Sequence, residues 1–224
     1  ILVCRQMNIK ILPPDVNRGT YGFSVDNGAI RYGLSAIKSV GRPVIEALVK
    51  EREDRGEFLS LKDFVERLSG VVNKRAIENF IKSGALDCLE GNRRQKMTVY
   101  GQLVDSIAKD KKNDIAGQIS LFDLAGEDVK KDFEIRMPDV EEYDKDTLLA
   151  FEKEVLGIYL SGHPLEQCRE IMEKIITART TDFQPEEDTG IVKIRDGQKV
   201  IVGGMITDKT CLLYTSDAAD DLMV

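Results

Sequence analysis

The sequence is poor in the residues that build metal sites. It contains no tryptophan and one histidine, His163, and its cysteines, Cys4, Cys88, Cys168 and Cys211, are scattered without a C-x-x-C pair. A structural zinc site takes four Cys or His ligands, usually in closely spaced pairs. The sequence therefore predicts no zinc site and favours free, buried thiols.

Long hydrophobic runs are also missing. No stretch approaches the roughly 18 uninterrupted apolar residues that a membrane-spanning helix requires. The N-terminal ILVCRQMNIKILPP does not show a signal peptide's order of positive charge, apolar run and cleavage site. We therefore expect no membrane contact and a cytoplasmic location. With 224 residues, 42% of them hydrophobic, the chain is long enough for one large domain or two small ones.

Charge is unevenly distributed along the chain. The net charge of −7 argues against extensive coating by nucleic acid. However, residues 30–96 carry 14 Lys and Arg against 10 Asp and Glu, whereas residues 127–154 carry 11 acidic against 5 basic residues. We therefore expect the mildly basic segment and the acidic segment to have different partners.

Helical spacing of apolar residues dominates the middle of the chain. A one-sided apolar stripe begins after Pro43 and ends at Gly56, and further stripes follow Ser60 and Asn73. Proline is favoured in the first turn of a helix, serine and asparagine at its N-cap, and glycine just past its end. These residues predict three short amphipathic helices.

The second half of the chain is less regular. Residues 109–138 lack sustained periodicity, as expected of a linker. Helical spacing resumes over residues 148–158 and 165–175, which we expect to form a helix pair. Residues 190–194 and 199–207, GIVKI and KVIVGGMIT, then alternate with period two and predict strands.

A tight turn, AIKSVGRP, stands between two predicted helices at residues 36–43. In a helix-hairpin-helix, such a turn directs backbone N–H groups and a helix N-terminus at a DNA phosphate, without reading the bases. The candidate DNA-binding residues are Lys38, Ser39, Val40, Gly41 and Arg42. Ser39 stands where such hairpins usually have their first glycine, and a left-handed serine there would cost about 1 kcal/mol. The alternative is an ordinary helix–helix turn.

Seven collinear segments carry a family resemblance. They are MNIKILPPDVN, IRYGLSAIKSVG, GEFLSLKDFVERL, NKRAIENFIKSGALD, GQISLF, EVLGIYLSGHPL and VIVGGMIT. In this order and spacing they resemble the DNA polymerase III alpha subunit, the bacterial replicative polymerase, over residues 1–210. The resemblance implies the following domains: the end of the fingers domain (1–30), a helix-hairpin-helix domain (31–108), a linker with a clamp-binding peptide (109–138), a helical connector (139–190) and the start of an OB-fold (191–210).

The linker contains one apolar island, with Gln118, Ile119, Leu121 and Phe122. It resembles the pentapeptide by which bacterial proteins bind the sliding clamp. In that mode Leu121 and Phe122 would fill an apolar pocket, and the Gln118 amide would make hydrogen bonds at its rim. Alternatively, Leu121 and Phe122 fold back onto the helical domain.

No catalytic group is predicted within this sequence. The resemblance implies that the parent polymerase holds its Mg²⁺-binding aspartates in a palm domain upstream of it. Asp144 and Asp146 are better explained as acidic residues at a helix start, and His163 has no patterned nucleophile near it. We therefore expect no cofactor here and three kinds of partner: double-stranded DNA, the sliding clamp and other replicase subunits.

Two rival functions are considered. One is a free-standing repair or recombination accessory protein with a helix-hairpin-helix. The other is a nuclease, which would need a clustered acidic site that the sequence does not contain.

The last residues, 211–224, do not continue the period-two pattern that precedes them. Their CLLYTSDAAD resembles a translated sequencing adapter, and an acidic C-terminal helix is the alternative. The fold class expected for the chain is α+β: a mainly α-helical helix-hairpin-helix domain, a linker and a helix pair, with short β at the N-terminus and the first OB-fold strands at the C-terminus.

Overall fold

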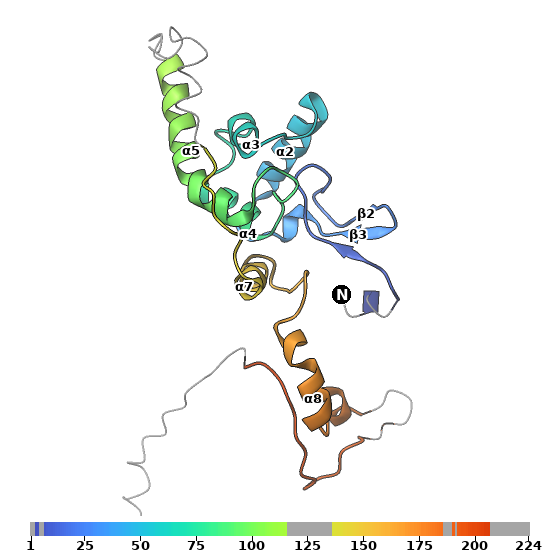
Figure 1. Cartoon of the computed structure of the whole chain (residues 1–224). Helices are drawn as coiled ribbons and strands as arrows, with labels where there is room; N and C mark the ends of the chain where they lie inside the picture. The colour runs from blue at the N-terminus through green and yellow to red at the C-terminus, as the bar shows by residue number, and fades with distance from the viewer. Residues whose placement is uncertain (1–2, 5–6, 116–135, 186–189, 191, 207–224) are drawn as a thin grey trace, which may run out of the picture. The chain divides into compact units, whose positions relative to one another are not determined.

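The computed structural model describes residues 3–4, 7–115, 136–185, 190 and 192–206. It divides the chain into two compact units, Ile1–His163 and Pro164–Val224 (Figure 1). The candidate clamp-binding residues 118–122 and the adapter-like residues 211–224 lie outside the described residues. No described helix is both long and apolar enough to cross a bilayer.

The first unit has a small mixed sheet near its N-terminus, where short β-structure was expected. Its strands are β1 (Ile11–Leu12), β2 (Ser24–Asp26) and β3 (Ala29–Arg31). The central strand β3 runs parallel to β1 and antiparallel to β2. Asn27 and Gly28 join β2 to β3 and both have positive φ, 52° and 79°, the conformation that a two-residue hairpin turn requires.

The helical part of this unit follows the sheet directly (Figure 1). Its elements are η1 (Leu34–Ala36), α2 (Arg42–Arg55), α3 (Leu61–Arg67), α4 (Lys74–Lys82) and α5 (Arg93–Ile115). The predicted caps are confirmed: Ser60 accepts a hydrogen bond from the Asp63 N–H, and Asn73 accepts one from the Ala76 N–H. Gly56 ends α2 with a φ of 81°.

Helices α3, α4 and α5 surround the hydrophobic core. The rings of Phe58, Phe64 and Phe80 are fully buried and form an edge-to-face series, with centroids 5.1 and 5.6 Å apart. Lys96 on α5 is also buried, and its ammonium donates hydrogen bonds to the carbonyl oxygens of Leu89 and Gly91. Burial lowers the pKa of this amine. Lys96 therefore stabilises the turn between α4 and α5.

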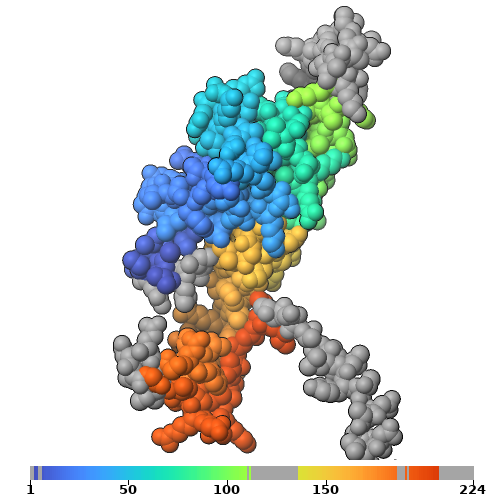
Figure 2. All heavy atoms as spheres, turned by 180° about the vertical axis from the view of Figure 1, so that it is seen from behind, coloured from blue at the N-terminus to red at the C-terminus, as the bar shows by residue number. Residues whose placement is uncertain are grey.

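Helix α7 (Lys145–Leu156) packs on α4 within the first unit. In Figure 2 its atoms are yellow and adjoin the blue and green atoms of the same unit. The Lys82 ammonium of α4 lies 2.9 Å from carboxylate oxygens of both Glu78 and Glu154, and 5.4 Å from the centre of the Phe151 ring. A lysine placed between two helices in this way joins α4 to α7.

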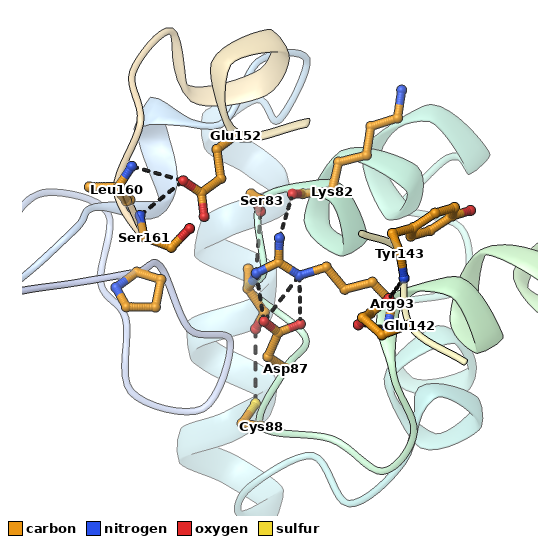
Figure 3. Close-up of polar contacts among 12 residues, drawn as sticks. Lys82, Ser83, Asp87, Cys88, Arg93, Glu142, Tyr143, Glu152, Leu160 and Ser161 are labelled. Atoms are coloured by element: carbon orange, nitrogen blue, oxygen red, sulfur yellow. Dashed lines mark hydrogen bonds and ion pairs between the residues drawn. The ribbon is translucent and has the colours of Figure 1, made fainter. Parts of the chain in front are cut away.

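Residues 137–143 connect back to the start of α5. The Glu142 carboxylate accepts a hydrogen bond from the backbone N–H of Arg93 at 2.8 Å (Figure 3). It accepts a second from the Arg94 N–H at 3.1 Å. Asn92 and Gln95 donate side-chain hydrogen bonds to the Val140 and Pro138 carbonyl oxygens. These hydrogen bonds attach residues 138–142 to the start of α5.

The second unit contains η2 (Pro164–Cys168), α8 (Arg169–Ile175) and η3 (Thr180–Phe183). The two helices predicted as a pair are therefore both present, but α7 and α8 belong to different units.

The strands predicted over 190–207 are not observed, because residues 190 and 192–206 contain no strand. Ile201 exchanges hydrogen bonds only with Thr177 and Ala178, which is too short a pairing to make a ladder.

The described cysteines are free, as predicted, but the prediction that they are buried is wrong. Cys88 and Cys168 are exposed and Cys4 is partly exposed. Cys88 lies in the turn after α4, and Cys168 lies where η2 meets α8. Turns of this kind leave side chains at the surface.

Candidate nucleic-acid interface

The turn predicted to bind DNA lies between η1 and α2. We call residues 37–41 the hairpin turn. Ile37 and Val40 are buried, at 2% and 8% exposure, whereas Lys38, Ser39 and Gly41 are exposed. The Val40 N–H donates to the Ile37 carbonyl oxygen at 3.3 Å, which closes the turn. The two apolar residues therefore fix the turn to the core while the others face solvent.

Ser39 adopts a left-handed conformation, with a φ of 62°. Two other described non-glycine residues have positive φ, and both are asparagines, which tolerate this region better than serine does. The structure thus meets the condition under which Ser39 costs about 1 kcal/mol. Glycine, which such hairpins usually have at this position, would adopt this φ with less strain.

The start of α2 is open to an outside acceptor. Gly41 provides no side-chain cap, and no acidic residue occupies the first turn. Within the described part of the chain, the N–H groups of Ser39, Gly41 and Arg42 find no hydrogen-bond acceptor. An uncapped helix N-terminus with several free N–H groups binds anions such as phosphate.

Four described helices of the first unit, in contrast, have side-chain caps. The first-turn N–H groups of α3, α4, α5 and α7 donate to Ser60, Asn73, Asn92 and Asp144, respectively. The α3–α4 turn, which also joins two short helices, is therefore less suited to bind a phosphate than the hairpin turn.

Two cations flank the open N–H groups. Lys38 is exposed. The Arg42 guanidinium lies 2.8 Å from a Glu46 carboxylate oxygen and 5.3 Å from the centre of the Tyr21 ring. The hydrogen bond to Glu46 raises the pKa of Arg42. Because both charged groups are exposed, this ion pair is weak, and Arg42 remains able to exchange Glu46 for a phosphate.

Two hydrogen bonds from elsewhere in the fold hold the hairpin turn. Asn79 of α4, 7% exposed, donates from Nδ2 to the Lys38 carbonyl oxygen at 2.6 Å. The Lys38 N–H donates to the Val155 carbonyl oxygen near the end of α7, at 2.9 Å. Sequence analysis missed both. Asn79 was detectable in principle, because it is a polar residue next to the apolar stripe of α4; the carbonyl of Val155 leaves no sequence signal.

The polar cluster in Figure 3 is structural. Arg93 is 8% exposed and pairs with Asp87 at 2.7 Å. Glu152 is 2% exposed, and its carboxylate accepts the N–H groups of Leu160 and Ser161. These groups have internal partners, and no set of three metal-ligating side chains occurs among the described residues.

Asp144 and His163 both make local contacts. Asp144 caps α7 by accepting the Thr147 N–H at 2.7 Å, and this hydrogen bond lowers its pKa. The ring of His163 lies against that of Tyr159, at 5.3 Å.

Comparisons of the sequence with known proteins cover this region. A family model described as a helix-hairpin-helix motif matches residues 8–96, which include η1, the hairpin turn and α2. The chain is 33% identical to DNA polymerase III subunit alpha of Chlamydia pneumoniae and 34% identical to that of Mycobacterium leprae, over 96% and 98% of its length. Identity to the Vibrio cholerae protein is 35%, over 91% of the chain.

The chain is homologous to DNA polymerase III alpha subunits. The family resemblance read from the sequence is therefore confirmed. The chain spans 18%, 19% and 17% of the length of these three relatives, so the activity and partners of a whole polymerase are proposals for it.

Proposed function

We propose that this region binds duplex DNA without sequence preference, as part of a replicative DNA polymerase. The observation that carries the proposal is the open start of α2, where the N–H groups of Ser39, Gly41 and Arg42 lack internal acceptors. Phosphate contacts of this kind position a protein on DNA but do not read its sequence. The helix-hairpin-helix match over residues 8–96 supports the same assignment.

The whole protein is proposed to extend a primer on a template, with Mg²⁺ bound by an upstream palm domain that this sequence does not contain. Three acidic groups have structural partners that support a non-catalytic role for this region: Asp144 caps α7, Glu154 pairs with Lys82, and Asp87 pairs with Arg93. Two further assignments rest on the family resemblance: Gln118, Ile119, Leu121 and Phe122 bind the sliding clamp, and residues from Lys193 onward begin an OB-fold.

The DNA proposal is tested with the full chain and a fluorescent duplex. Gly41→Ala places a methyl group beside the open N–H groups. The backbone of Gly41, at φ −77° and ψ 159°, suits any residue, and the new Cβ would meet only Pro43 Cδ at 3.6 Å. The fold should therefore persist while phosphate approach is hindered, and we expect affinity to fall about tenfold, as for one lost charged hydrogen bond.

Gly101→Ala is the matched control, because the added Cβ meets no atom within 4 Å on α5. Replacing both Lys38 and Arg42 with alanine should reduce the salt dependence of binding by about two phosphate contacts. Equal affinity and equal salt dependence in all these variants would place the DNA contact elsewhere.

A further inference from the structure

Two exposed aromatic side chains lie in the segment before β2, which contacts η1. Tyr21 is 47% exposed and Phe23 is 63% exposed. The Phe23 ring meets the Tyr32 ring edge-to-face, with centroids 4.7 Å apart. Because Ser24 pairs with Arg31, Phe23 and Tyr32 continue the β2–β3 pairing by one residue. Tyr32 thus supports Phe23 across the sheet and leaves most of the Phe23 ring open to solvent.

The backbone of this aromatic loop is joined to the start of the hairpin. The N–H groups of Leu34 and Ser35, in η1, donate to the carbonyl oxygens of Thr20 and Tyr21 at 3.0 and 3.1 Å. Gly33 permits the close approach, because a Cβ there would lie 2.6 Å from the Gly22 carbonyl carbon. The loop and η1 are therefore fixed to each other through backbone contacts.

Tyr21 also contacts a side chain from the start of α2. The Arg42 guanidinium carbon is 5.3 Å from the centre of the Tyr21 ring, and Arg42 is the first residue of α2. A DNA strand whose phosphate binds at the start of α2 would therefore lie about one Arg42 side-chain length from the Tyr21 ring.

We propose that Tyr21 and Phe23 stack against unpaired bases of a DNA strand whose adjacent phosphate is bound at the hairpin turn. The inference rests on the proposed duplex binding and adds a preference for duplexes with a single-stranded overhang. Single-strand binding proteins combine cations along the backbone with exposed aromatic rings on which bases stack. The duplex interior keeps its bases stacked on one another, so an unpaired base next to the duplex fits this surface.

The test compares a blunt duplex with the same duplex carrying an overhang, with 2-aminopurine as its first unpaired base. The wild-type chain should bind the overhang DNA at least about fivefold more tightly and quench the 2-aminopurine fluorescence, as stacking on one ring would. Tyr21→Leu and Phe23→Leu keep an apolar side chain but remove the ring. Each should reduce the preference and the quenching while leaving blunt-duplex affinity unchanged.

Val25→Ala is the matched control, since Val25 is 82% exposed in β2 and has no ring. It should retain the wild-type preference. If wild-type chain binds the blunt duplex but shows neither preference nor quenching, the stacking surface is refuted while duplex binding stands; the aromatic side chains would then serve as a protein contact. Absence of binding to both DNAs would refute the proposed function and this inference together.

Discussion

Asn79 on α4 donates a hydrogen bond to the backbone carbonyl of Lys38, at 2.6 Å. This contact joins two residues separated by 41 positions and orients the peptide that precedes the left-handed Ser39. Asn79→Ala should destabilise the fold by about 1–2 kcal/mol, because one hydrogen bond is lost, and it should also weaken DNA binding. The measurements are urea unfolding and duplex affinity at low salt.

The control for Asn79→Ala is Val99→Ala, which removes a buried side chain from α5. It should cost a comparable amount of stability and leave DNA affinity unchanged. If both variants weaken DNA binding equally, Asn79 has only a general structural role and does not position the hairpin turn.

Ser39→Gly should stabilise the protein. Glycine adopts a φ of 62° without a steric cost, so the gain should approach 1 kcal/mol, reduced by the larger entropy of glycine in the unfolded chain. Urea midpoints of wild type and variant measure the difference. A lower midpoint for the variant would show that the serine hydroxyl contributes more than the backbone strain removes.

Glu46→Gln should strengthen DNA binding at low salt. Glu46 pairs with Arg42, and both side chains are well exposed, at 61% and 71%. Removing the carboxylate frees the guanidinium and deletes a negative charge near the phosphate, so affinity should rise about two- to fivefold. The gain should vanish at high salt because the charges are screened. An increase that is independent of salt would contradict the electrostatic origin.

Sequence patterns predicted the helices best where local signals agree. Ser60 and Asn73 are capping residues, each followed by an apolar stripe, and both cap helices in the structure. The hairpin turn was also predicted, from Ser39, Gly41 and the proline that follows them, and it lies between η1 and α2.

Contacts between distant segments were not predictable in the same way. Glu142 binds the start of α5, and the backbone carbonyl of Val155 binds Lys38. A carboxylate in an acidic run does not show which N–H groups it will meet, and a backbone acceptor has no residue type. The predicted strands over 190–207 had the right alternation, but a strand also requires a neighbouring strand, which residue spacing alone does not supply.

Glu142 should make stability depend on acid pH. Its burial raises the pKa, but hydrogen bonds from the Arg93, Tyr143 and Arg94 N–H groups outweigh this, and the pKa is lowered overall. A carboxylate with a lowered folded pKa contributes stability above its unfolded pKa, near 4.3, and loses it as pH falls through the folded pKa.

Glu142→Gln tests this contribution. The variant should be less stable at neutral pH by about 1 kcal/mol, as for a lost helix cap, and the two proteins should converge in stability as pH falls below about 4. Urea unfolding at a series of pH values measures both curves. A constant difference across the acid range would mean that the charge of Glu142 does not carry the effect.

The clamp-binding proposal makes the last prediction, on a peptide spanning residues 116–124. An apolar side chain that fills a pocket commonly costs about 2 kcal/mol when truncated. Leu121→Ala and Phe122→Ala should therefore each weaken binding to purified sliding clamp by roughly 30-fold. Gln118→Ala should cost less, because water can replace its hydrogen bonds, and Ser120→Ala should be nearly silent, which makes it the control.

Ordering a flexible peptide opposes its binding, so the peptide alone should bind with micromolar affinity. In a chain that also holds DNA at the hairpin turn, the peptide is confined near a clamp on the same DNA, and its effective concentration rises. Clamp affinity of the full chain should therefore increase when clamp-loaded duplex replaces free clamp, and Gly41→Ala should remove part of that increase without changing the affinity of the peptide. Equal clamp affinities for the wild-type and Phe122→Ala peptides would instead assign Leu121 and Phe122 to packing within the protein.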